Sequence, residues 1–132
     1  MNAATQADRG NTPSDADQAS VLLHRSVSEP DLLARFFRVL GDPTRVHLLQ
    51  LLLEAPTGEC TVGELVAAVS APQSRVSTHL GCLRWCGLVR TRREGKQIYY
   101  RAADPRVREV LIIGGALLRD YAADVASCGV NR

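Results

Sequence analysis

The spacing of apolar residues predicts helices over most of the chain after residue 30. Between Asp31 and Leu40 apolar side chains recur every three to four residues, which is typical of an amphipathic helix. Gly41 ends that pattern. Asp42-Pro43 then begins a second helix, because aspartate is a favoured N-cap and proline suits the first helical turn. This second helix is apolar on most sides, so we expect it at the centre of the core; its apolar residues are Val46, Leu48, Leu49, Leu51, Leu52 and Leu53.

Two more helices are predicted close together after the Pro56-Thr57-Gly58 break. Thr61 and Glu64 have the spacing of a capping box, which predicts the start of a short helix. Ser70-Ala71-Pro72 interrupts it, and a longer helix follows over Gln73–Trp85. Its apolar residues lie on one face and its first half is polar and basic on the other. Two helices joined by a short turn, of which the second has a polar and basic outer face at its start, predict a helix-turn-helix.

A hairpin and a last helix complete the predicted fold. Leu88–Arg92 and Gln97–Arg101 alternate like strands, and Gly95 between them can adopt the positive φ of a tight turn. A mostly apolar helix follows over residues 106–126. Its Gly114-Gly115 pair costs roughly 1 kcal/mol per residue relative to alanine, which suggests close approach of a second subunit, with a simple kink as the open alternative. The expected fold is mainly α with a two-stranded β wing, a dimeric winged helix-turn-helix.

Composition and charge add the domain limits and a candidate surface. Residues 1–19 show no apolar period and are interpreted as a disordered arm, residues 20–126 as the DNA-binding and dimerisation domain, and residues 127–132 as a tail. We see no apolar run long enough for a membrane span and no signal peptide, so we expect a cytoplasmic protein without a membrane partner. The net charge is +2 overall but +6 over residues 71–101, which fits either a phosphate-binding surface or a solvated charged face.

Four segments together resemble the ArsR/SmtB family of repressors: FRVLGDPTRVHLLQLLL, TVGELVAAV, VSTHLGCLRWCGLV and REGKQIYYRAAD. They occur in the family's order, and the match as a whole runs from about Asp31 to Asp124. The resemblance implies a homodimer, paired through its first and last helices, that binds double-stranded operator DNA and loses affinity for it on binding metal. The implied DNA contacts are Gln73, Ser74, Arg75, Ser77, Thr78 and His79, with Arg92, Arg93, Lys96 and Gln97 from the wing.

The chemistry of these side chains suits that role. Gln bonds adenine and Arg bonds guanine bidentately in the major groove, while Ser, Thr and the wing cations suit phosphate oxygens. For His79, local packing or capping on its helix is an open alternative.

The cysteines suggest what the protein senses. Cys82 and Cys86 are one helical turn apart on one face, and in a reducing cytosol thiols or metal ligands are the expected states. LGCLRWCGLV resembles the L-x-C-L-R-x-C-G-L-V segment of the CmtR-type cadmium/lead sensors of that family, with Trp85 as a bulkier departure. That type takes a third thiolate from the C-terminal region, which implies Cys128 here. Three thiolates favour Cd(II) or Pb(II) as the inducer, and Hg(II) or As(III) are the next candidates. No organic cofactor is expected.

Other sites of the family fit the sequence less well. In the family's arsenic-type site a pair of cysteines lies at the start of the third helix, but here only Cys60 occurs there, one position away from the expected place. We expect Cys60 to be a small buried side chain. Its zinc-type site retains Asp104 and Asp120 but has Arg106 and Leu117 at the histidine positions.

Three alternative functions compete with metal sensing. A redox switch that oxidises Cys82 and Cys86 stays open, although the helical spacing disfavours a direct disulfide. An enzyme using His79 and Cys82 lacks an oxyanion donor and an orienting acid, so no catalytic residue is expected. A winged helix that binds only proteins is disfavoured by the basic recognition helix and wing.

Overall fold

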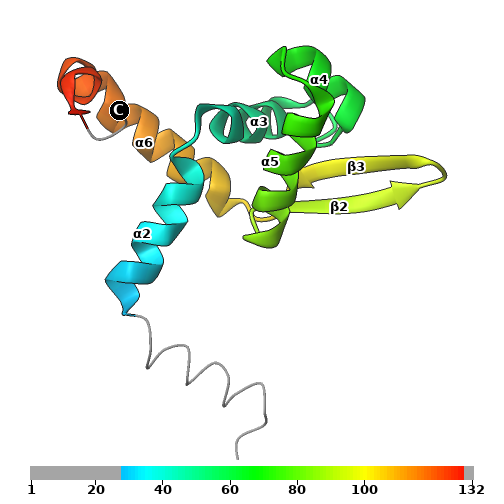
Figure 1. Ribbon diagram of the computed structural model, residues 1–132, viewed down its shortest axis with the longest axis horizontal. Coiled ribbons are helices and arrows are strands. Elements are labelled where there is room, and N and C mark those ends of the chain that lie inside the picture. The colour runs from blue at the N-terminus through cyan, green and yellow to red at the C-terminus, as the bar shows by residue number, and fades with distance from the viewer. Residues whose placement is uncertain (1–27, 130–132) are drawn as a thin grey trace, which may run out of the picture. The chain divides into compact units, whose positions relative to one another are not determined.

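The computed structural model describes residues 28–129 as helices and a small sheet (Figure 1). The helices are α2 (Glu29–Leu40), α3 (Pro43–Glu54), α4 (Val62–Val69), α5 (Gln73–Trp85) and α6 (Arg106–Ser127), and the strands are β1 (Cys60–Thr61), β2 (Val89–Glu94) and β3 (Gln97–Ala102). The predicted arm 1–19 and residues 130–132 of the predicted tail lie outside the described residues. The chain divides into two units, 1–35 and 36–132, with the boundary inside α2. The fold below is that of the second unit.

The core is built around α3, as its apolar pattern predicts. Leu48 and Leu49 are fully buried and Leu52 is almost so. They form one cluster with the buried side chains of the other elements, which are Leu65, Val76, Leu80, Leu83, Leu88, Val89 and Val107. Burying a Leu or Val side chain contributes roughly 1.5–3 kcal/mol. This cluster therefore joins α3 to the helix-turn-helix, to the sheet and to the start of α6.

The two predicted helix caps are present. The Oδ1 atom of Asp42 accepts the backbone N–H of Arg45 at 3.1 Å, which starts α3. At α4 the backbone N–H of Glu64 donates to the Thr61 hydroxyl at 3.3 Å, and the backbone N–H of Thr61 donates to Glu64 Oε2 at 3.0 Å. Both bonds of the capping box are thus formed, so the helix-turn-helix begins where the sequence predicts.

The sheet has three strands, not the two that the sequence predicts. β2 and β3 form the expected antiparallel hairpin, from Val89↔Ala102 to Glu94↔Gln97, with Gly95 at φ +60° in the turn. β1 then pairs with the other edge of β3 through Cys60↔Tyr100 and Thr61↔Tyr99, giving the order β1-β3-β2. The prediction missed β1 because a two-residue strand has no alternating pattern of its own and its partner is distant in the sequence.

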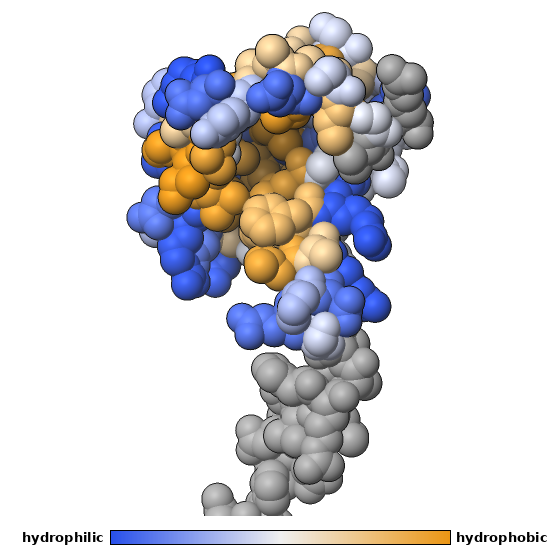
Figure 2. All heavy atoms as spheres, turned by 90° about the vertical axis from the view of Figure 1, so that its left-hand side faces the viewer, coloured by the Kyte–Doolittle hydropathy of each residue, from blue (hydrophilic) through white to orange (hydrophobic). Residues whose placement is uncertain are grey.

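Helix α6 carries a row of exposed apolar side chains. The large apolar residues that are about half exposed or more are Ile112, Ile113, Leu117, Leu118, Tyr121 and Val125, and Figure 2 shows hydrophobic surface on the side of the molecule toward which α6 runs in Figure 1. The helix is regular through Gly114-Gly115 and departs from helical geometry at Tyr121 (φ −126°, ψ 22°) instead. A Cβ added at Gly114 would meet open space. Within residues 28–129, no helix combines the length and the apolar character needed to cross a membrane.

Candidate DNA-binding surface and thiol pair

The packing of α5 decides which of its side chains face outward. Val76, Leu80 and Leu83 form a buried stripe at 0% exposure. The predicted contacts on the opposite side are all exposed: Gln73, Ser74, Arg75, Ser77 and Thr78. The Thr78 hydroxyl donates to the Ser74 carbonyl at 2.9 Å, so one of these groups is already bonded to its own helix. The first half of α5 therefore presents a contiguous polar surface with one cation.

His79 lies apart from that group. Its side chain is only 16% exposed, and its Nε2 atom is 3.9 Å from Oδ1 of Asp42 at the start of α3. Partial burial raises the pKa of Asp42, but the N–H of Arg45 and the charges of His79 and Arg45 outweigh that effect and leave the pKa lowered. The structure therefore places His79 in a contact between α5 and α3, the local packing that the sequence left open, rather than on the outward face.

The four predicted wing residues differ in their surroundings. Arg93, Lys96 and Gln97 are exposed at the tip, and Nε of Arg93 donates to the Gly95 carbonyl at 3.2 Å. Arg92 is instead held by two carboxylates, those of Glu59 and Glu94. Glu59 could not be singled out from the sequence, because it lies 33 residues before Arg92 and no local pattern connects the two.

Cys82 and Cys86 are held side by side by the end of α5. The backbone N–H of Cys86 donates to the Cys82 carbonyl at 3.0 Å, and Gly87 (φ +76°) then reverses the chain so that the N–H of Leu88 reaches the Leu83 carbonyl at 2.9 Å. This is the hydrogen bonding of a Schellman end, and it keeps Cys86 one turn after Cys82. Glycine is needed because the reversal requires a positive φ.

The two thiols are close enough for one to shift the pKa of the other. Burial raises the pKa of the Cys86 thiol, and the neighbouring Cys82 raises it further through its charge and a hydrogen bond. The charge of the Arg45 guanidinium acts in the opposite direction, but the pKa stays raised. Cys82 is half-buried and Cys86 exposed. The pair is therefore accessible from outside on the helix that carries the polar surface.

The other two cysteines lie elsewhere. Cys60 is half-buried in β1 and packs against the core, and burial together with Glu64 raises its thiol pKa. Cys128 is exposed directly after α6. In the part of one chain that the structure describes, no three His, Cys, Asp or Glu side chains gather closely enough to hold a metal ion. Residues 28–129 of a single chain thus supply a thiol pair and not a complete three-ligand site.

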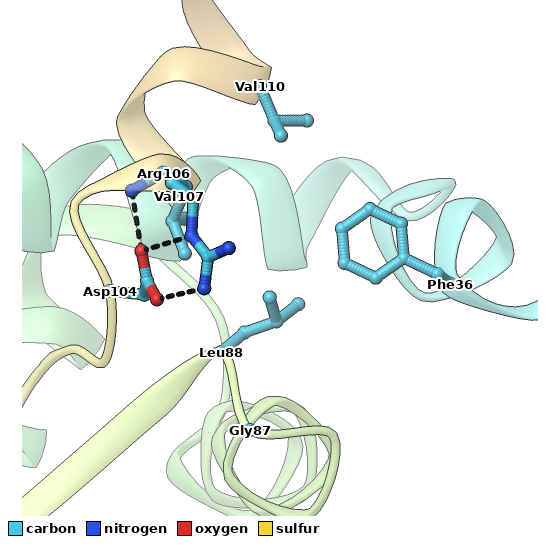
Figure 3. A pocket seen from close by; sticks show the side chains of 7 residues that line it. All are labelled: Phe36, Gly87, Leu88, Asp104, Arg106, Val107 and Val110. Carbon is cyan, nitrogen blue, oxygen red and sulfur yellow. Dashed lines mark hydrogen bonds and ion pairs between the residues drawn. The ribbon is translucent and has the colours of Figure 1, made fainter. Parts of the chain in front are cut away.

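A pocket of about 320 Å³ lies where α6 begins, and Figure 3 shows its lining. Its walls are mostly apolar, but Asp104 and Arg106 are paired at one side. Asp104 accepts the Arg106 backbone N–H at 2.8 Å and its guanidinium at 2.8 and 3.0 Å. The hydrogen bonds from Arg106 lower the pKa of Asp104 to about 2. A carboxylate engaged in this way is a poor metal ligand, because the guanidinium would have to be displaced.

Known proteins resemble this chain in sequence. Residues 42–91, which span α3 to β2, match the model of the "Bacterial regulatory protein, arsR family". The chain is 46% identical over 101 residues to a probable mercury resistance operon repressor of Streptomyces lividans, covering 76% of this chain and 78% of that protein. It is also 46% identical over 79 residues to the transcriptional regulator CmtR of Mycobacterium tuberculosis, covering 60% of this chain and 64% of CmtR.

Solved structures share the fold. The homodimeric winged helix-turn-helix DNA-binding domain of Mb0332 from Mycobacterium bovis superposes with a TM-score of 0.61 at 27% identity, over 92% of this chain and 93% of that one. The solution structure of the cadmium metal-sensor CmtR from M. tuberculosis gives a TM-score of 0.50 at 44% identity, over 59% of this chain and 78% of that one. The architecture is therefore that of a winged helix-turn-helix.

Proposed function

The chain belongs to the arsR family of bacterial regulatory proteins, and we propose that it represses transcription as a homodimer on operator DNA and is released by a thiophilic heavy metal. The family and the similar proteins above are transcriptional regulators and not enzymes, and the same holds for this chain. Acting on the chromosome, it would work in the cytoplasm. The observation that carries the metal response is the pair of thiols held one helical turn apart on the helix that also presents the polar surface.

The operator is read by the first half of α5. Gln73 and Arg75 are exposed there and have the side chains that bond adenine and guanine edges in the major groove. Ser74, Ser77 and the wing tip would contact phosphates, which fix the register of the protein on the duplex. The buried stripe on the other side of α5 keeps these groups aimed outward.

A second copy of the chain would cover the apolar row of α6. Soluble proteins rarely expose large contiguous apolar patches, and those that occur usually mark interaction surfaces. The open space beside Gly114 would let another backbone approach. The Mb0332 domain is described as homodimeric, and dimers of this kind read two half-sites one helical turn of DNA apart.

The inducer would be bound by the thiolates of Cys82, Cys86 and Cys128. The pair fits one soft ion, but within one chain the described residues bring no third ligand to it. Cys128, exposed after α6, would supply it from the same or the partner subunit. Thiolate ligands favour soft metals, so we expect Cd(II) or Pb(II), with Hg(II) or As(III) next. The names of the cadmium sensor and the mercury resistance repressor support this class of ions.

Release follows from linkage. If the metal binds the free dimer better than the DNA-bound dimer, it must weaken operator binding by the same factor. Closing a site between the end of α5 and the tail of α6 would restrain the reading helix. Coupling of about 1–3 kcal/mol is typical and corresponds to roughly 5- to 150-fold weaker binding.

The test is an anaerobic titration of Cd(II) into the reduced protein bound to a fluorescent fragment of its own promoter. Thiolate-to-metal absorption in the ultraviolet and the anisotropy of the DNA are followed together. The variant is Cys128→Ser, and Cys60→Ser is the matched control because Cys60 packs against the core in β1. We expect absorption to saturate at one ion per subunit as DNA is released, with Cys128→Ser losing release and Cys60→Ser behaving like the wild type.

Two results would contradict parts of this proposal. If DNA stays bound and no absorption develops with Cd(II) or, in repeat titrations, with Pb(II), Hg(II) and As(III), the protein does not sense metal, and release by peroxide would then identify the thiol-redox repressor. If metal binds and releases DNA equally well in Cys128→Ser, the third ligand is wrong while the metal response stands.

A further inference from the structure

Arg92 in the wing is bound by groups from three directions. Its Nε lies 2.8 Å from both carboxylate oxygens of Glu59, and its Nη2 is 2.8 Å from Oε2 of the same residue. Its Nη1 donates to Glu94 at 2.7 Å. The guanidinium also lies over the Tyr99 ring, 4.4 Å from its centroid. All three guanidinium nitrogens and one face of the group are therefore occupied.

The charge of Arg92 is offset by the two carboxylates that hold it. Cross-strand partners share a face, and the register pairs Arg90 with Arg101 and Arg92 with Tyr99. The carboxylates of Glu59 and Glu94 lie against Arg92, whereas Asp104 is held by Arg106. Arg92 therefore brings little net charge of its own to a phosphate backbone.

The opposite face and the turn are different. Arg93 pairs with Ile98 on that face, and its Nε donates to the Gly95 carbonyl in the turn. Lys96 lies in the turn itself and is exposed. Among residues 28–129 neither cation forms an ion pair with a carboxylate. Their charges are therefore available to a phosphate.

Glu59 connects Arg92 to the helix-turn-helix. It directly precedes β1, whose second residue Thr61 is also the N-cap of α4. Its side chain is only 18% exposed, compared with 47% for Arg92. A phosphate would thus have to draw Arg92 away from a shielded, bidentate partner.

We propose that Arg92 does not contact DNA but anchors the wing through Glu59, leaving Arg93 and Lys96 as the phosphate-binding cations of the wing. This assignment rests on the proposed operator binding. The anchor fixes the hairpin to the segment that starts α4, so the wing and the reading helix present their contacts to DNA in one fixed arrangement. Arg92 is then a positioning residue.

Arg92→Lys separates the two roles, because lysine keeps the charge but cannot form the planar, bidentate contact. Operator affinity is measured across a series of salt concentrations for Arg92→Lys, Arg92→Gln and Glu59→Gln. Arg93→Gln is the comparison for a phosphate contact, and Glu54→Gln is the control for loss of an exposed carboxylate. Circular dichroism confirms that each variant is folded.

For an anchor, all three changes at Arg92 and Glu59 lower affinity alike, by up to about fivefold, and leave the salt slope unchanged. The double variant Arg92→Gln/Glu59→Gln is no weaker than either single variant, since both remove the same contact. Arg93→Gln lowers the slope by about 0.9 per subunit, and Glu54→Gln changes nothing.

The proposal is overturned if Arg92→Lys binds like the wild type while Arg92→Gln lowers the salt slope by about 0.9 per subunit. It is also overturned if Glu59→Gln tightens binding more than Glu54→Gln, because Glu59 would then be holding Arg92 back from DNA. Failure of operator binding itself looks different: the wild type would show no salt-dependent affinity for its promoter, and Arg75→Gln would have no effect.

Discussion

Replacing Asp42 by alanine should destabilise the protein by about 1.5 kcal/mol. Its carboxylate accepts the Arg45 N–H at 3.1 Å and so caps α3, and loss of such a cap costs about 1 kcal/mol. The negative charge at the start of the helix adds roughly 0.3–1 kcal/mol. The contact with His79, at 3.9 Å, ties α3 to α5, but at 32% exposure of the Asp42 side chain it adds little more.

Asp42→Asn is the matched control, because asparagine is an equally good N-cap without the charge. We expect it to lose only about 0.5 kcal/mol, the contribution of the charge. The assay is urea unfolding followed by circular dichroism at one protein concentration, since the stability of a dimer depends on concentration. The role of Asp42 as a cap is refuted if the free energy of unfolding of Asp42→Ala lies within about 0.3 kcal/mol of the wild-type value, which is near the limit of what such measurements distinguish. It is also refuted if Asp42→Asn loses as much stability as Asp42→Ala.

The same pair of proteins tests the sign of the pH dependence. The pKa of Asp42 is lowered in the folded protein, so its charge stabilises the fold above the unfolded value of 3.8 and loses that contribution as the pH falls through and below it. The difference in stability between the wild type and Asp42→Asn should therefore shrink below about pH 4. A difference that grows with acid would contradict the assignment.

Three further outcomes are expected. Leu80→Ala, at a fully buried position of α5, should cost about 2–5 kcal/mol in urea unfolding, and a loss below about 1 kcal/mol would mean that α5 is not packed as described. Leu117→Glu, on the exposed row of α6, should convert dimer to monomer in analytical ultracentrifugation while the helix content stays constant; an unchanged dimer would place the interface elsewhere. Arg106→Gln should move the pKa of Asp104 from about 2 toward 3.8 in a carboxyl NMR titration, and no movement would show that Arg106 does not hold it.

Much of the fold could be predicted because its signals are local. A cap, a turn glycine or an amphipathic stripe acts over a few neighbouring residues, so the roles of Asp42, Thr61 and Gly95 follow from the sequence alone. The i, i+4 spacing of Cys82 and Cys86 likewise predicts that they are neighbours, since a helix brings such positions onto one face. The polar first half of α5 was predictable for the same reason.

The remaining features depend on partners that lie far away in the sequence. β1 exists only because β3 offers it an edge, through Cys60↔Tyr100. His79 was assigned to the outward face by its neighbours in the sequence, but the arrival of Asp42 from α3 decides where its side chain lies. Arg92 is the same residue type as Arg93, and only the approach of Glu59 from before β1 separates an anchored cation from an exposed one.

The sequence by itself determined, to within two residues, where the helices begin and end, and it also determined which stripe of each is apolar and which residue types gather on α5 and in the wing. Those properties follow from backbone hydrogen bonding and side-chain polarity within a few residues. Only the tertiary structure decided which of the gathered cations and thiols are paired, shielded or open. Charge pairing and burial depend on distances through space, and the fold sets these by packing α3, α5 and the sheet around one core.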